Sequence, residues 1–206
     1  SFYNEAVTFF YEGHDNGSLT NYIMESGQCQ ESGRDQNHTM LGIGHLAEAC
    51  EIAYNQGNET LWSASENRLM KGYEYTAKYN LGHDVSFEPF TDVTGVRWNN
   101  ISDEDRGKFR PVFEIAYNHY VTRKGLEMPY TQQVISRISP ERDAMWCDHP
   151  GYGTLLFRTE SGMPPSEGAI DAKGTEWKVA TANATTAADG DNLVVTPALQ
   201  SNGKYR

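Results

Sequence analysis

The sequence predicts a mainly α-helical chain of antiparallel helical hairpins, followed by the start of a β-rich C-terminal region. Two segments with helical spacing of apolar residues are joined by a short link, and glycines stand where each segment ends. The composition then changes to Pro, Ala, Thr, Asn, Asp and Gly. We therefore expect a helical domain over residues 1–161, and a linker with the opening strands of a second domain over residues 162–206.

The first hairpin is predicted from two helical segments. After His38, apolar residues recur at helical spacing until Gly57, a good residue to end a helix. The second segment begins with Ser63 and Glu66, which have the spacing of a capping box, and ends at Gly82. The short link between them favours an antiparallel pair. The apolar positions of the first segment are Leu41, Leu46, Ala49, Ile52 and Ala53.

The rest of the helical part is predicted as a long loop and two further helices. Residues 83–107 contain Pro, Gly and an acidic cluster, and loops of this length are often functional. A third helix is expected from Pro111 to Gly125 and a shorter fourth from Thr131 to Ile138. Beyond the helical part, β-like segments are found at residues 177–179 and 193–196.

Composition and charge narrow the class of partner. Of the 206 residues, 38% are hydrophobic and 12% aromatic, which is enough for a packed core. The net charge of −11 argues against a nucleic-acid or membrane-surface binder, because such proteins depend on clustered Lys and Arg. No apolar run approaches the length of a membrane-spanning helix. An anionic ligand would have to be held by a local basic cleft.

Glycosylation sequons point to a secreted, extracellular protein. Three cysteines, Cys29, Cys50 and Cys147, lack metal-site spacing and would allow one disulfide with one free thiol. The chain begins at Ser1, as a processed or truncated product would. The sequons begin at Asn16, Asn37, Asn58, Asn100 and Asn183.

The first chemically informative element is the polar run at residues 28–39, which leads directly into the first helix. Gln36, Asn37 and His38 place amide and imidazole groups at a helix N-terminus, where the helix dipole also favours an anion. The simpler alternative is that Asp35 or Asn37 caps the helix and that His38 is a hydrogen-bonded first-turn residue.

The second element contains Arg110 and Tyr117, seven residues apart. On an α-helix this spacing leaves the two side chains about 20° from alignment, two turns apart, so both could contact one ligand. The alternative is that Tyr117 and Tyr120 are core aromatics of an amphipathic helix.

Together the two elements offer what β-elimination from a uronic acid requires. The proton at C5 becomes removable when an amide or imidazole offsets the charge of the adjacent carboxylate. Gln36, Asn37 and His38 supply such groups. A base must then take the proton and an acid must protonate the leaving oxygen. Tyr117 is the candidate if Arg110 lowers its pKa.

At these residues the sequence resembles the alginate lyase superfamily of (α/α) toroid polysaccharide lyases. The similarity covers roughly Leu19 to Phe157 and is greatest to a branch that includes polysaccharide lyase family 38, whose members act on alginate or glucuronan. The resemblance implies an incomplete (α/α) toroid, since a toroid needs more helices than this chain has, and a preceding helical portion. It is carried by residues 31–57, 67–82, 117–120 and 149–154.

The resemblance also implies residue roles. Asn37 or Gln36 would neutralise the substrate carboxylate, and His38 would be a base or second neutraliser. Arg110 and Tyr117 would match the Arg and catalytic Tyr of the family. The branch often carries Gly at the position of Asn37, which shifts weight to Gln36. The expected partner is an acidic polysaccharide, with no cofactor. Expected substrate-binding residues are Arg34, Trp98, His119, Tyr120 and His149.

Several alternatives remain open from the sequence. His45 shares a face with His38, although a buried, hydrogen-bonded histidine is the simpler interpretation. Arg68 and Tyr75 repeat the spacing of seven and form a rival pair. No His, Asp and Glu cluster has metal-ligand spacing, so no metal is expected. The alternative functions are a glycoside hydrolase, with Asp35 and either Glu74 or Glu114 as its carboxylates, and a non-catalytic carbohydrate-binding protein.

Overall fold

The computed structural model describes residues 1–92, 94–143, 148–158, 184–189 and 192–197. The chain divides into two compact units, Ser1–Gly168 and Ala169–Arg206, and each is described by itself. The described part is mainly helical, as predicted. The domain boundary expected after residue 161 falls outside the described residues and stays a prediction.

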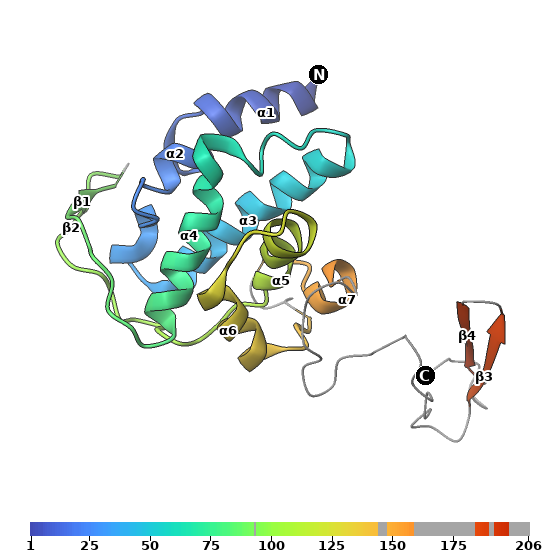
Figure 1. The fold of residues 1–206 in the computed structure, drawn as a ribbon. Coiled ribbons are helices and arrows are strands. Elements are labelled where there is room, and N and C mark those ends of the chain that lie inside the picture. The colour runs from blue at the N-terminus through green and yellow to red at the C-terminus, as the bar shows by residue number, and fades with distance from the viewer. Residues whose placement is uncertain (93, 144–147, 159–183, 190–191, 198–206) are drawn as a thin grey trace, which may run out of the picture. The chain divides into compact units, whose positions relative to one another are not determined.

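The first unit packs helices around one hydrophobic core (Figure 1). The long helices α3 and α4 pack against each other, and α4 also packs against α6. Two short strands, β1 and β2, pair within the long loop between α4 and α5. The elements are α1 (Phe2–Glu12), η1 (Asp15–Gly17), α2 (Leu19–Tyr22), η2 (Gln30–Gly33), α3 (Gln36–Asn55), α4 (Ala64–Asn80), β1 (Phe90–Thr91), β2 (Arg97–Trp98), α5 (Phe113–Tyr117), the π-helical η3 (Asn118–Arg123), α6 (Pro129–Ile138) and α7 (Gly153–Phe157).

The predicted first hairpin is confirmed as α3 and α4, with one local error. Asp35 caps α3, because its Oδ1 accepts a hydrogen bond from the backbone N–H of His38 at 2.7 Å. The capping box predicted for α4 is wrong. Ser63 makes no cap bond, since its hydroxyl donates to the carbonyl of Thr60, and residues 65–67 have positive φ. The regular part of α4 therefore begins later than its capping signal suggested.

The helix predicted from Pro111 to Gly125 is shorter and changes type. It begins at Phe113 as α5 and becomes π-helical from Asn118. Oε1 of Glu141 accepts hydrogen bonds from the backbone N–H groups of Phe113 at 2.7 Å and Glu114 at 3.2 Å. A carboxyl oxygen from elsewhere in the chain thus caps the first turn. Arg110 consequently lies before the helix and not on it.

The buried Glu141 makes folding stability depend on pH. Burial, together with the nearby Glu114 carboxylate, raises the pKa of Glu141 to about 8. The folded state therefore holds a proton that the unfolded state releases above about pH 4.5, so this group's contribution to stability is lost as pH rises towards 8. Glu141→Gln keeps the Oε1 acceptor and removes the titration. The free energy of unfolding of the variant minus that of the wild type should therefore rise by about 2 to 3 kcal/mol when the pH is raised from 5.5 to 8.5. Urea unfolding at both pH values measures this, and an unchanged difference would contradict it.

Two of the three cysteines are buried thiols in the core. Cys29 and Cys50 are free, so they do not form a disulfide with each other. Cys147, the third, lies outside the described residues. Burial raises the pKa of Cys29 to about 12, which keeps this thiol protonated and unreactive.

The described part of the second unit is a β-hairpin. Strand β3 (Ala184–Asp189) pairs antiparallel with β4 (Asn192–Pro197), and Asp189 lies opposite Asn192 at the turn end. The β segment predicted at residues 193–196 is confirmed, and that at 177–179 lies outside the described residues. Within the described parts of both units, no helix combines the length and apolarity needed to cross a bilayer.

Candidate functional site

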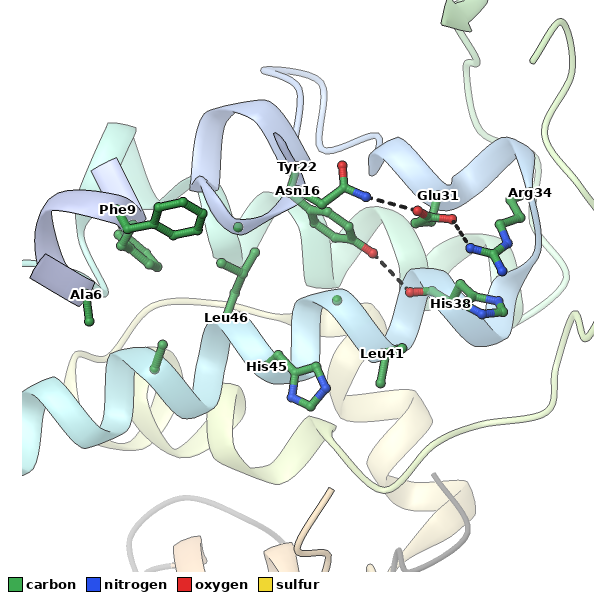
Figure 2. A pocket seen from close by; sticks show the side chains of 14 residues that line it. Ala6, Phe9, Asn16, Tyr22, Glu31, Arg34, His38, Leu41, His45 and Leu46 are labelled. Carbon is green, nitrogen blue, oxygen red and sulfur yellow. Dashed lines mark hydrogen bonds and ion pairs between the residues drawn. The ribbon is translucent and has the colours of Figure 1, made fainter. Parts of the chain in front are cut away.

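A concave site lies between α1, the α2 region and one face of α3 (Figure 2). We call it the α1–α3 pocket; its volume is about 600 Å³. Figure 2 shows Arg34 and His38 at one end and Ala6 and Phe9 at the other. Apolar and polar side chains therefore both line the pocket. The apolar lining includes Phe9, Phe10, Leu41 and Leu46, and the polar lining includes Asn16, Glu31, Arg34, His38 and His45.

A smaller pocket adjoins it and contains Trp98. This Trp98 pocket, of about 180 Å³, shares Asn16, Glu31 and Arg34 with the α1–α3 pocket. Glu31 organises the shared wall, because its two oxygens accept hydrogen bonds from Asn16 at 3.0 Å and Arg34 at 3.4 Å. The Trp98 indole N–H donates to Asp92 at 3.1 Å. The structure thus brings the predicted ligand-binding residues Arg34 and Trp98 to one pocket.

His38 is held by a carboxylate and is open to the α1–α3 pocket. Its Nδ1 lies 2.6 Å from Oδ2 of Asp35, and 36% of its side chain is exposed. Because an ionised carboxylate only accepts hydrogen bonds, this contact assigns the proton to Nδ1. The Nε2 lone pair is then free to accept a proton from a bound ligand.

Asn37 is held by Arg110, which joins the two predicted chemical elements. Nε of the buried Arg110 donates to Oδ1 of Asn37 at 2.7 Å. An arginine can only donate, so the contact also fixes which end of the amide faces it. The Nδ2 donors of Asn37 are directed away from Arg110. Asn37 is half-buried and lies outside the lining of the two pockets above.

Gln36 has a structural position. It is 1% exposed, and its side-chain amide makes its contacts inside the protein. Its Nε2 donates to the carbonyls of Ser32 at 3.3 Å and Ser102 at 2.9 Å. Its Oε1 accepts from Asn80 at 2.9 Å. With donors and acceptor engaged, Gln36 links α3 to α4 and the long loop and is not free to neutralise a substrate carboxylate.

Tyr117 does not have the environment expected of it. It is 3% exposed and belongs to the core cluster. Burial, with a smaller effect of the Glu114 carboxylate, raises its pKa. The expectation that Arg110 lowers the Tyr117 pKa from the same helix face is therefore wrong, because α5 begins after Arg110.

His119 and Tyr120, expected to bind substrate, also lie in the core. The His119 ring stacks on Trp62 with centroids 4.5 Å apart, and the Tyr120 hydroxyl donates to the Trp62 carbonyl at 2.7 Å. Burial, then the charges of Arg123 and Lys124, lowers the pKa of His119 to about 4. Both residues hold the π-helical segment η3 against the core.

The rival pair is likewise engaged in structural contacts. Nη1 of Arg68 donates to the carbonyl of Ile23 at 3.0 Å. The Tyr75 hydroxyl donates to the carbonyl of Ser86 at 2.6 Å. Neither group is presented to the two pockets described above.

A second polar cluster is formed by His45, Glu48 and His149. His149 is 6% exposed, and its Nδ1 lies 2.8 Å from Oε1 of Glu48. His45 Nδ1 lies 3.1 Å from Oε2 of the same carboxylate. His45 is 49% exposed at its side chain, so the interpretation of it as a buried histidine is wrong. Glu48 was missed; its spacing of three from His45 on one helix was the available signal.

Comparison with known proteins identifies no relative. The chain matches no family model, no curated protein and no solved structure.

Proposed function

We propose that this protein is a polysaccharide lyase that cleaves a uronic-acid polymer, alginate or glucuronan, by β-elimination. One observation carries the proposal. The consecutive residues Asn37 and His38 at the start of α3 are each oriented by a separate charged partner, Arg110 and Asp35. This arrangement fixes the Asn37 amide at the start of α3 and leaves the second ring nitrogen of His38, the next residue, open to the α1–α3 pocket.

The surroundings favour an anionic sugar. The N-terminus of α3 carries a partial positive charge, and the exposed guanidinium of Arg34, which also pairs with Glu31 and Asp35, lies next to it in the sequence. Trp98, half-buried in the adjoining pocket, offers an aromatic surface of the kind on which sugar rings pack. These local features would hold an acidic polymer in spite of the net charge of −11.

The elimination would then proceed through His38. Donors of Asn37 and Arg34 offset the carboxylate charge as electron density develops on it. Nε2 of His38 takes the proton from C5, the bond from C4 to the glycosidic oxygen breaks, and a double bond forms between C4 and C5. The proton passes from His38 to the leaving oxygen, and Asp35 stabilises the transient imidazolium. His38 thus takes the role first expected of Tyr117.

The proposal also covers the complete fold, secretion and glycosylation. We propose that the helical hairpins are part of an (α/α) toroid and that the protein is secreted as a glycoprotein. The sequon at Asn37 lies in the first turn of α3, with Thr39 buried. A glycan on Asn37 would consume the amide that the mechanism uses, so we expect this sequon to be unmodified.

The reaction class can be tested directly. The chain is incubated with mannuronan, guluronan, glucuronan and a neutral glucan, and ultraviolet absorbance and new reducing ends are followed together. A lyase should raise both signals on at least one polyuronate and neither on the neutral glucan. Reducing ends without absorbance would replace the proposal with a glycoside hydrolase. Binding of a polyuronate with neither signal would indicate a carbohydrate-binding protein.

Asn37→Asp tests the neutralising amide. The variant keeps the acceptor facing Arg110 but replaces the outward donors with a negative charge. We expect kcat/KM on the preferred polyuronate to fall by about 100-fold, the loss typical of one missing donor at a developing anion. The matched control is Asn99→Asp, an exposed position in the long loop, which should remain within about twofold. Equal activity of the two variants would exclude Asn37 from the chemistry.

A further inference from the structure

The cluster of His45, Glu48 and His149 has the composition of a metal site. The Glu48 carboxylate lies between the two imidazoles, with one oxygen 2.8 Å from His149 and the other 3.1 Å from His45. One ligand atom from each residue can be chosen so that all three lie within 4.8 Å of one another. The two imidazole rings are themselves close, with centroids 4.5 Å apart. Sequence spacing did not reveal the cluster, because His149 lies about a hundred residues from the other two.

The hydrogen bonds of His149 leave its ring incompletely satisfied. One nitrogen contacts Glu48, whereas Nε2 is buried and has no partner among the described residues. A buried ring nitrogen without a partner is unusual in a histidine that serves only packing. In the tautomer that carries the ring proton on Nε2, the Nδ1 lone pair of His149 faces the Glu48 carboxylate and can be given to a cation held between them.

The backbone of α3 makes room for this imidazole. A Cβ on Gly44 would lie 2.5 Å from Cε1 and 2.9 Å from Nε2 of His149, closer than atoms can approach. A glycine inside a helix lowers helix stability by up to about 1 kcal/mol relative to alanine. Gly44 therefore lowers the local stability of α3 but allows His149 to approach the helix backbone closely.

We propose that His45, Glu48 and His149 bind a divalent transition-metal ion, with Zn²⁺ as the best match. Two nitrogen ligands and one carboxylate oxygen suit Zn²⁺, whereas Mg²⁺ and Ca²⁺ take mainly oxygen ligands. Ligands around a tetrahedral zinc lie about 3.3 Å apart, so the contacts at 2.8 and 3.1 Å need only a small opening.

Three protein ligands leave one coordination position open. His45 lines the α1–α3 pocket, whereas Glu48 and His149 line a separate small pocket with Gly44, so we expect the open position to be reached from the His45 side. Water or a carboxylate of a bound ligand would complete the coordination there. The site is independent of the proposed lyase activity, since metal binding is measured without any polysaccharide.

Titration calorimetry of the metal-stripped chain with ZnCl₂ tests the proposal, and visible absorption with Co²⁺ reports the coordination. We expect one equivalent to bind with a submicromolar Kd and Mg²⁺ not to compete. His45→Ala and Glu48→Gln should each raise Kd by at least about 100-fold. His83→Ala, which removes an exposed imidazole packed on Tyr130, is the matched control and should leave Kd unchanged.

Gly44→Ala tests the metal site without removing any of the three proposed ligands. It should displace His149 and raise Kd by at least about 10-fold while circular dichroism shows the helices intact. The proposal is overturned if the wild-type chain binds no stoichiometric Zn²⁺, if Mg²⁺ competes at similar concentrations, or if the ligand variants bind Zn²⁺ as tightly as His83→Ala does.

Discussion

Replacing His38 with alanine should lower kcat on the preferred polyuronate by about 10²- to 10⁴-fold, the contribution of a positioned general base. The reason is that Nε2 of His38 faces the α1–α3 pocket while Asp35 holds the other nitrogen. Binding of the polymer should change little, since Arg34 and Trp98 remain. Initial rates from product absorbance and affinity from polymer titration separate the two effects.

The companion variant Asp35→Asn tests how His38 is oriented. An asparagine still caps α3, so the fold should persist. It no longer stabilises the imidazolium, and its amide can select the wrong ring tautomer. We expect kcat to fall substantially with KM nearly unchanged. The control His14→Ala removes an exposed imidazole and should leave kcat and KM unchanged.

Full activity of His38→Ala would contradict the proposed mechanism.

Trp62→Ala should lower the free energy of unfolding by about 3 to 5 kcal/mol, as expected for a large aromatic removed from a core. Trp62 is 0% exposed, stacks on His119 with an interplanar angle of 10°, and meets the Tyr120 ring edge-on. Urea unfolding measures the loss. The control is Trp98→Ala, a half-buried pocket residue, which should cost much less stability and instead weaken polymer binding.

Trp62→Ala should also change how the stability of the protein depends on acid pH. His119 has a pKa of about 4 when folded, below its unfolded value near 6.5, mainly because it is buried. The unfolded state therefore binds an extra proton between these values, and stability is lost as pH falls through that window. Removing Trp62 exposes the ring and should raise the His119 pKa, which reduces this part of the loss. An unchanged His119 titration by NMR would show that Trp62 does not desolvate the ring.

The sequence was sufficient for features that depend on neighbouring residues. Periodic apolar positions located α3 and α4, although the capping signal of α4 was wrong, and local sequence also located α6, since a helix is built from contacts three and four residues apart. Asp35 was one of the two candidate caps, and the structure selects it because its partner, the backbone N–H of His38, is only three residues away. The long loop and β4 followed in the same way from local composition.

Tertiary structure decided every feature that depends on remote partners. The start of α5 was misjudged because its cap, Glu141, lies 28 residues after Phe113. Tyr117, predicted as a site residue, is buried in the core, and no local sequence pattern distinguishes a catalytic tyrosine from one packed in the core.

The site itself shows the same division between local and remote information. The residue types of Asn37 and His38 suggested chemistry from the sequence alone. The orientation of the Asn37 amide depends on Arg110, 73 residues away, and the Glu48 cluster depends on His149, 101 residues away. A sequence pattern reports which groups are present on one element, whereas packing of distant segments determines which groups meet, in what orientation and with how much water.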